Sequence, residues 1–193
     1  MRHVLVAIVQ DEPGVLARMA SLFARRGYNI MSFAAGASEV PGFTRVTIVV
    51  EGANTVLDQI AKQFRKLIGV VKVADLTVGG DYLAHEMLLV KVRVNSRTRQ
   101  EVVGLADLFK ARIVDVSSNT LILQATGEPD KLDAFLDVLK PFGIREQARS
   151  GVMAINRGAK ILGFRPGVEV EKRAEVGGDR QPDSEPETPA DVP

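Results

Sequence analysis

The stretch HVLVAIVQDEPGVLARMASLF, residues 3–23, determines how the first part of the chain folds. Its opening run, HVLVAIV (3–9), is short, continuous and rich in β-branched side chains, which predicts a strand buried on both faces. The polar segment QDEPG (10–14) then interrupts the apolar run. Beyond it, apolar residues recur at helical spacing, which predicts an amphipathic helix from about Pro13 to Arg26. The residues on its apolar stripe are Val15, Leu16, Met19, Leu22 and Phe23.

The residues that follow complete one supersecondary unit. Gly27 suits the end of the first helix, as Pro13 suits its first turn. The remaining predicted elements are a strand from Tyr28 to about Gly36, a strand FTRVTIVVE (43–51), a helix from about Thr55 to Ile68 and a strand VVKVADLTV (70–78). The order is βαββαβ, the pattern of a ferredoxin-like domain.

The same order then occurs a second time. Its predicted elements are MLLVKVRV (87–94), a helix near Arg99–Lys110, RIVDV (112–116), TLILQAT (120–126), a helix near Asp130–Lys140 and a strand around Ile144–Arg149. Two copies of one unit indicate two domains of one architecture. We therefore predict an α+β protein with two ferredoxin-like domains, each a four-stranded antiparallel sheet with two helices on one face. The first domain spans 1–78, a linker 79–86 and the second domain 87–163.

The last segment of the chain, residues 164–193, has a different composition. Five of the nine prolines fall between Pro166 and Pro193, and residues 169–193 hold eight acidic and three basic side chains. Such a segment cannot bury enough apolar surface to offset the entropy of ordering it. We predict a disordered, proline-rich acidic tail.

Composition excludes several classes of function. The formal net charge of +1 gives no electrostatic reason to bind nucleic acid or membranes, and the chain has no cysteine for disulfides or thiolate metal sites. No apolar run approaches the ~18 residues of a membrane helix. The predicted strands also lack the aromatic platforms of RNA-binding sheets. We expect a soluble, cytoplasmic protein that contacts neither nucleic acid nor membrane.

Catalytic signatures are missing as well. His3 and His85 lie in a strand and a linker without a second metal ligand nearby, and Ser117 and Ser118 occupy a hairpin turn. No glycine-rich phosphate-binding motif occurs, and the pair Gly79-Gly80 by itself indicates a linker. We predict no catalytic residues, no metal site and no cofactor in this chain.

The loop before the first helix is the strongest candidate for a binding site. The start of a helix leaves backbone N–H groups unpaired and carries partial positive charge, which suits a small carboxylate. Gly14 allows a ligand to approach the backbone, and Asp11 could accept an ammonium group. Together these features describe a site for a free α-amino acid. On the residues alone, an ordinary N-cap at Asp11 followed by a Pro-Gly turn is the simpler interpretation.

A resemblance favours the binding site. DEPGVLARMASLFARRGYNI (11–30) resembles the opening of ACT domains, the amino-acid-sensing modules of metabolic enzymes. Further matching stretches are TRVTIVVEG (44–52), LDQIAKQFRKLIGVVKV (57–73), ARIVDV (111–116), TGEPDKLDAFLDVLKPFGIRE (126–146) and ARSGVMAINRG (148–158). In combination they are similar to the small regulatory subunits of acetolactate synthase (acetohydroxyacid synthase), over roughly residues 1–158.

The resemblance implies a function and a set of site residues. Such subunits have no catalytic activity; they stimulate a large catalytic subunit and confer feedback inhibition by valine or a related branched-chain amino acid. Thiamine diphosphate, Mg²⁺ and FAD are expected in that catalytic partner. The effector site is expected to comprise Asp11, Pro13, Gly14, Val15, Leu16, Asn29 and Ile30. Two departures concern the pocket: some relatives have asparagine at the position of Asp11, and relatives often have an acidic residue at that of Met31.

Helix length adds a geometrical constraint. Asp11 precedes the first helix and Asn29 follows it, and about 13 helical residues at ~1.5 Å each separate them by roughly 20 Å. One amino acid cannot touch both within a single chain. We therefore predict a homodimer, paired through the first helix and second strand, with the site shared between subunits; the second domain would supply contacts to the catalytic subunit. The alternatives are a free-standing ACT amino-acid sensor acting on another enzyme or on transcription and, more distantly, a small ferredoxin-like hydrolase.

Overall fold

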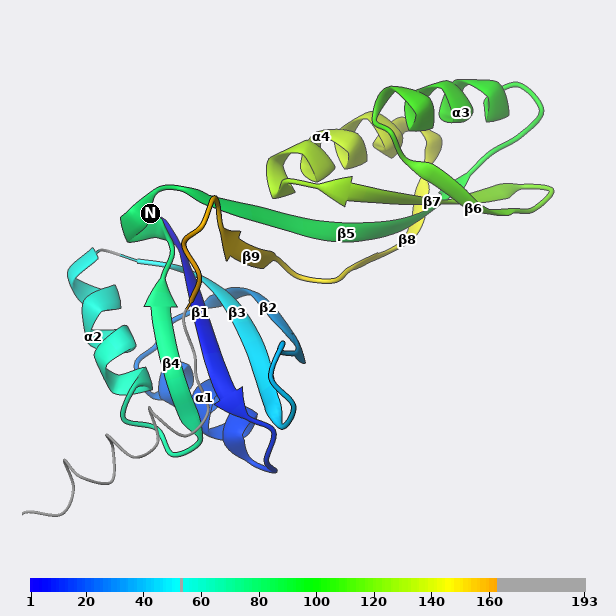
Figure 1. The fold of residues 1–193 in the computed structure, drawn as a ribbon. Coiled ribbons are helices and arrows are strands. Elements are labelled where there is room, and N and C mark those ends of the chain that lie inside the picture. The colour runs from blue at the N-terminus through cyan, green and yellow to red at the C-terminus, as the bar shows by residue number, and fades with distance from the viewer. Residues whose placement is uncertain (53, 163–193) are drawn as a thin grey trace, which may run out of the picture. The chain divides into compact units, whose positions relative to one another are not determined.

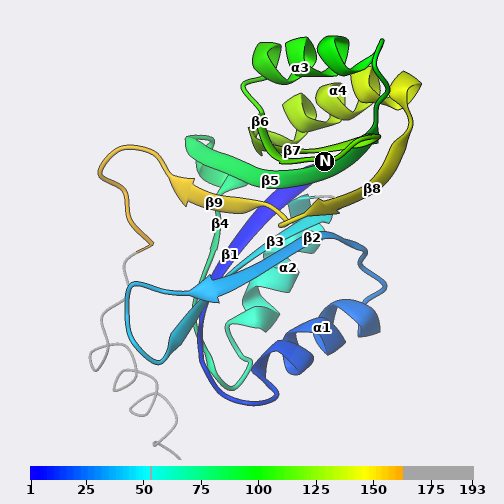
Figure 2. The ribbon, with the colours of Figure 1, turned by 90° about the vertical axis from the view of Figure 1, so that its right-hand side faces the viewer.

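The computed structural model describes residues 1–52 and 54–162 of this protein (Figure 1). The acidic tail predicted to be disordered, residues 164–193, lies outside the described residues. Within them, two antiparallel sheets are formed, each with two helices on one face, as the sequence predicts (Figures 1 and 2).

The first sheet contains the four strands predicted for it, in the spatial order β2-β3-β1-β4. Its elements are β1 (Arg2–Gln10), α1 (Val15–Arg25), β2 (Ile30–Ala37), β3 (Phe43–Glu51), α2 (Asn54–Phe64) and β4 (Val70–Asp75). β1 is central and pairs antiparallel with both β3 and β4, whereas β2 is an edge strand that pairs with β3. Residues 3–9 of β1 are all buried, which confirms the prediction of a strand covered on both faces.

The helix-covered face of this sheet carries the first apolar core. Val15, Met19, Leu22 and Phe23 of α1 are buried there. The Phe23 ring packs against Phe64 of α2 with ring centroids 5.2 Å apart. Leu16 differs from the prediction that placed it on the apolar stripe, because its side chain is 42% exposed. It lies one residue after buried Val15, at the edge of the face that meets the sheet.

The second sheet repeats the topology, in the spatial order β6-β7-β5-β8. Its elements are β5 (Tyr82–Arg93), α3 (Arg99–Leu108), β6 (Arg112–Val116), β7 (Thr120–Gly127), α4 (Pro129–Leu139) and β8 (Ile144–Arg149). Short 3₁₀ turns occupy Thr77–Gly79 and Lys140–Phe142. Its core contains the Phe109–Phe135 pair, with ring centroids 4.9 Å apart. β6 corresponds to β2, since both are edge strands next to the strand that pairs with the central one.

One feature of the fold is not predicted by the sequence pattern. β5 begins at Tyr82, five residues before the predicted strand, and its residues Tyr82–His85 pair with an additional strand, β9 (Met153–Asn156). We call residues 82–85 and 150–156 the β5–β9 ribbon. A strand of four residues is too short for its alternation to be recognised in sequence.

The ribbon covers the outer face of the first sheet. Val152 and Ala154 are buried there in one apolar cluster with Val4, Val6, Val49 and Leu76. From the sequence, the alternation of FTRVTIVVE (43–51) puts Arg45, Thr47 and Glu51 on this face, which they would cover only partly, so that a face or an edge of the sheet is left for a dimer to bury. Thr47 is in fact buried. The expectation of an open face is therefore wrong, because a distant part of the same chain occupies it; the outer edge of β2 remains available.

Candidate effector site at the mouth of the first helix

The loop between β1 and α1 is held in place by its backbone. The Gln10 N–H donates to the Gly69 carbonyl at 2.7 Å, and the Asp11 N–H donates to the Gly42 carbonyl at 2.9 Å. Two neighbouring loops thus fix the path of residues 10–14. The side chains of Asp11, Glu12 and Pro13 are left exposed beside the start of the helix.

The helix begins at Val15, two residues later than predicted. Its N-cap is Gly14, whose φ of +85° and ψ of −9° lie in the left-handed region, where a residue with a Cβ is strained. No side chain caps the helix, so the interpretation of Asp11 as an ordinary N-cap is wrong. The Val15 N–H donates to the Glu12 carbonyl at 3.4 Å, and the N–H groups that follow it in the first turn have no partners inside the helix. Such donors and the helix dipole favour a bound anion.

Arg18 adds a full positive charge to the same place. A methyl group built on Gly14 would lie 3.3 Å from Arg18 Nη1, and one built on Gly69 would lie 3.6 Å from Nη2. The guanidinium therefore lies against two glycine backbones at the start of α1. Its Nε is buried and has no hydrogen-bond partner within the described part of the chain. A buried donor left unpaired is costly, and a guanidinium matches the two oxygens of a carboxylate.

Arg18 was not among the predicted site residues, although a signal for it exists. It follows Gly14 by four residues, one helical turn. Side chains on a helix lean toward its N-terminus, so a residue at this spacing reaches back over the mouth. What the sequence does not reveal is that the buried Nε finds no partner among residues 1–52 and 54–162.

The predicted site residues lie at the two ends of α1, and one of them, Val15, has a buried side chain. Asp11, Pro13, Gly14 and exposed Leu16 surround the mouth of α1, whereas Asn29 and Ile30 lie just beyond its other end. The Val15 side chain is only 1% exposed and belongs to the core. Val15 can therefore meet a ligand at the mouth through its backbone alone.

The structure does not bring these two groups together within one chain. Gln10, next to the mouth, pairs with Phe43, whereas Ile30 pairs with Val50. Phe43 and Val50 are seven residues apart on β3, which corresponds to about 24 Å along a strand. The two groups thus lie at opposite ends of the sheet.

Other kinds of site are not indicated by the described residues. Residues 1–52 and 54–162 contain no cluster of three or more histidine, aspartate or glutamate side chains that could hold a metal ion. In the same residues, no helix has the length and apolar character needed to cross a membrane.

The ferredoxin-like topology of the first domain is that of the ACT class. The family model described as an AHAS small subunit-like ACT domain matches residues 5–72. A second, described as the small subunit of acetolactate synthase, matches residues 85–158. The chain belongs to the family of acetolactate synthase small subunits.

Individual relatives agree with this assignment. The acetolactate synthase small subunit of Mycolicibacterium smegmatis is 47% identical over 161 residues, which cover 83% of this chain and 94% of that protein. The probable acetolactate synthase small subunit of Methanothermobacter thermautotrophicus is 45% identical over 83% of this chain and 95% of its own length. The crystal structure of the acetolactate synthase small subunit from Thermotoga maritima superposes with a TM-score of 0.78 at 38% identity, covering 83% of this chain and 99% of that one.

Proposed function

We propose that this chain is a non-catalytic regulatory subunit that stimulates the large catalytic subunit of acetolactate synthase and makes it sensitive to valine or a related branched-chain amino acid. Membership of the small-subunit family supports the catalytic partner. The observation that carries the effector site is the buried Arg18 Nε, which has no partner among the described residues, at a helix mouth without a side-chain cap.

The effector would be held by groups of opposite charge. Its carboxylate would accept hydrogen bonds from Arg18 and from the N–H groups of the first turn, where Gly14 permits close approach. Its ammonium would donate to exposed Asp11. Arg18 and Asp11 together select a zwitterion over a simple carboxylic acid, because either partner alone would leave one ligand charge unpaired.

The apolar part of the effector would be recognised by a second chain. Asn29 and Ile30 lie too far from the mouth to contribute within one chain, so we propose a homodimer in which they complete the partner's site. The edge strand β2 and exposed Leu16 are suited to this contact, since an edge strand presents unpaired backbone groups. An interface with two-fold symmetry would create two equivalent sites.

The catalytic groups would reside in the partner. Thiamine diphosphate, Mg²⁺ and FAD would be bound by the large subunit, and the second domain of this chain would supply contacts to it. The test is reconstitution: the purified chain is mixed with the large subunit of the same organism, and acetolactate formation is measured with and without valine. We expect stimulation without valine and inhibition with it. An unchanged rate in both cases, with valine still binding to the isolated chain, would instead favour a free-standing amino-acid sensor.

A further inference from the structure

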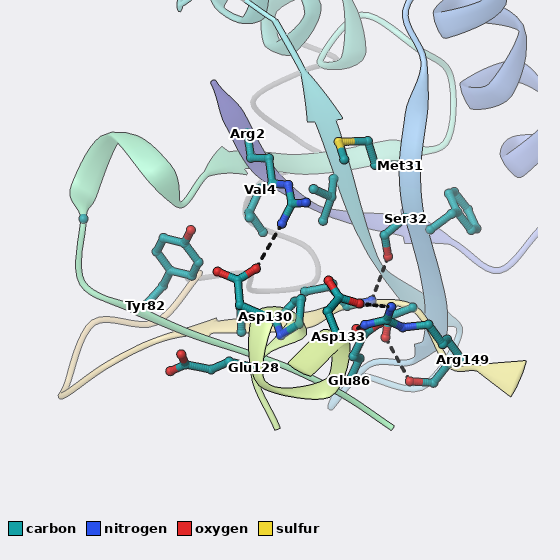
Figure 3. Close-up of a pocket in the computed structure, with 18 residues that line it drawn as sticks. Arg2, Val4, Met31, Ser32, Tyr82, Glu86, Glu128, Asp130, Asp133 and Arg149 are labelled. Carbon is teal, nitrogen blue, oxygen red and sulfur yellow. Dashed lines mark hydrogen bonds and ion pairs between the residues drawn. The ribbon is translucent and has the colours of Figure 1, made fainter. Parts of the chain in front are cut away.

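A direct hydrogen bond connects the effector-site strand to the β5–β9 ribbon. The Val152 N–H donates to Ser32 Oγ at 2.7 Å (Figure 3). Ser32 lies on β2, two residues after Ile30, one of the proposed effector residues. A second bond lies on the neighbouring strand, where the Arg45 guanidinium donates to the Ala154 carbonyl at 2.9 Å. Burial lowers the pKa of Arg45, against an opposing influence of Glu39.

The contact at Ser32 also requires a glycine. Gly151 has a φ of +77°, and a Cβ built on it would lie 2.8 Å from the Phe33 carbonyl oxygen and 3.1 Å from Ser32 Oγ. No side chain fits in that space without displacing β2 or the ribbon. The backbone of residues 151–152 therefore lies directly on the backbone of residues 32–33.

A bulge in β2 orients Ser32 toward the ribbon. Ile30 pairs with Val50 and Ser32 pairs with Val49, so Met31 is an extra residue in β2 at this point. Val50 belongs to the core under the helices, whereas Val49 belongs to the cluster under the ribbon. Without the bulge, residues two apart would point to the same face. The bulge thus places the effector residue Ile30 and the ribbon contact Ser32 on opposite faces.

Hydrogen bonds also connect the ribbon to the second domain. The Ser150 N–H donates to the Met87 carbonyl at 3.0 Å, and the Met87 N–H donates to Ser150 Oγ at 2.9 Å. One residue earlier, the Arg149 guanidinium pairs with buried Glu86 and, at 2.6 Å, with Asp133 of α4 (Figure 3). Burial alone would lower the pKa of Arg149, but its bonds to Asp133 and Glu86 raise it. A displacement of residues 151–152 would therefore be transmitted to α4 and β8.

Space for such a movement exists beside the contact. An open cavity of about 750 Å³ is bordered by Met31, Ser32 and Phe33 on one side and by residues 149–152 on another (Figure 3). A close-packed interior resists displacement, whereas a strand beside a cavity can shift without repacking a core.

We infer that the contact between Ser32 and residues 151–152 couples the effector site to the second domain. This inference rests on the proposed function. A ligand at Asn29 and Ile30 favours one position of the start of β2, the bulge at Met31 carries the shift to Ser32, and Ser32 moves the ribbon with the domain attached to it. A merely structural role would instead predict that weakening the contact lowers stability and leaves inhibition intact.

Two substitutions test the inference by separating valine binding from valine inhibition. Ser32→Ala removes the hydrogen-bond acceptor, and Gly151→Ala introduces a methyl group into the contact. In each case valine should bind the isolated chain with an affinity within about twofold of wild type, and stimulation of the catalytic subunit should persist. The valine concentration for half-inhibition should rise at least about fivefold, the lower range of typical coupling between sites. Ser32→Thr, which retains the hydroxyl, should behave as wild type.

Two matched control variants test whether backbone strain alone, or the loss of a hydroxyl elsewhere, changes the inhibition. Gly158→Ala places the same strain at a φ of +63°, where a Cβ would meet nothing within 4 Å. Ser96→Ala deletes an exposed hydroxyl of the second domain. Both control variants should be inhibited as wild type. Unchanged inhibition of the Ser32→Ala and Gly151→Ala complexes would overturn the inference, as would a loss of valine binding, which would assign Ser32 to the effector site. If wild type itself is not inhibited by valine, the proposed function has failed instead.

A measurement on the wild-type chain keeps the test independent of folding in the variants. Hydrogen exchange of the peptide that contains the Gly151 and Val152 amides should change when saturating valine is added. The peptide spanning β6, on the far edge of the second sheet, should serve as the internal reference. Identical exchange of the 151–152 peptide with and without valine would contradict the inference.

Discussion

The two domains share one topology, yet the mouths of their first helices differ. Before α3, the Asn95 side chain accepts hydrogen bonds from the Arg97 and Thr98 N–H groups at 2.9 and 3.0 Å. The arginine in the first turn of α3, Arg99, donates to the carbonyls of Ser117 and Ser118 at 2.8 and 2.7 Å. Neither helix has a side-chain hydrogen bond from its N-cap residue, but the N-cap of α1 is a left-handed glycine, whereas that of α3 is Thr98, whose N–H is bonded to Asn95.

The difference shows which mouth is available for a ligand. In the second domain the polar groups of the loop and the arginine are satisfied by the protein itself. In the first domain Arg18 occupies a similar place, but its buried Nε has no partner among the described residues. Proteins rarely leave a buried donor unpaired, and each exception needs an explanation; a bound carboxylate at the mouth would supply the acceptor that Arg18 lacks. On the proposed function, the same fold would serve as a binding site in the first domain, whereas the corresponding polar groups of the second domain are paired within the protein.

The largest effect is expected for Gly14→Asp, which closes the open mouth with a carboxylate. The effector would lose two charge-assisted hydrogen bonds worth about 1.5–3 kcal/mol each, so valine affinity should fall at least about tenfold. Because the φ of Gly14 is +85°, the substitution should also cost about 1 kcal/mol of folding stability. The complex should remain stimulated and become valine-insensitive. Calorimetry on the isolated chain and inhibition of the reconstituted enzyme are the paired readouts.

Gly158→Asp is the matched control for this prediction. It places the same charge and a similar strain at a φ of +63°, in open space. Valine should bind this variant as it binds wild type. If Gly14→Asp folds and also binds valine with wild-type affinity, the effector site does not lie at the mouth of α1.

A smaller pair of opposite effects is expected for the two arginines. Arg18→Gln should weaken valine binding about tenfold without lowering the melting temperature, because it removes a charged group whose Nε is buried and unpaired. Arg99→Gln should leave valine affinity unchanged and lower the melting temperature by about 2–4 °C, since two carbonyls lose their donor. Calorimetry gives the valine affinity of each variant, and thermal melting gives its melting temperature. Equal valine affinities for the two variants would contradict the distinction between the mouths.

The smallest effect is expected for removal of residues 164–193. The removed segment is rich in proline and acidic residues, which contribute little to a core. Melting temperature and valine affinity should therefore match those of the full chain. A melting temperature lower by several degrees would show that the segment stabilises one of the two domains.

Sequence reasoning recovers the elements that depend on local periodicity. The continuous β-branched run of β1 and the apolar stripe of α1 report burial directly, because strand and helix have different repeats. The repeated βαββαβ order then follows from counting elements along the chain. The loop QDEPG (10–14) also marks the mouth of α1 as a candidate site, since the residue types that suit a ligand there are adjacent in sequence.

The features that the sequence does not reveal depend on tertiary contacts. That Arg18 Nε has no partner in the described part of the chain depends on residues far from it in sequence, so no local pattern contains this information. The β5–β9 ribbon brings Val152 onto a sheet more than a hundred residues earlier in the chain, and its second strand has only four residues. The bulge at Met31 arises from pairing with β3, where the residue type alone gives no signal.

The central claim is that each effector site is built from the α1 mouth of one chain and the β2 start of another. It is tested most directly by mixing two defective chains. One carries Gly14→Asp and the other Asn29→Ala, and each alone should bind valine at least about tenfold more weakly than wild type. After unfolding and refolding together in equal amounts, about half the dimers should contain both chains, and each of these has one intact site. The account predicts that titration calorimetry recovers wild-type affinity at about one quarter of the wild-type number of sites. If the refolded mixture contains mixed dimers but no high-affinity sites, both groups belong to a site within a single chain, and the account is wrong.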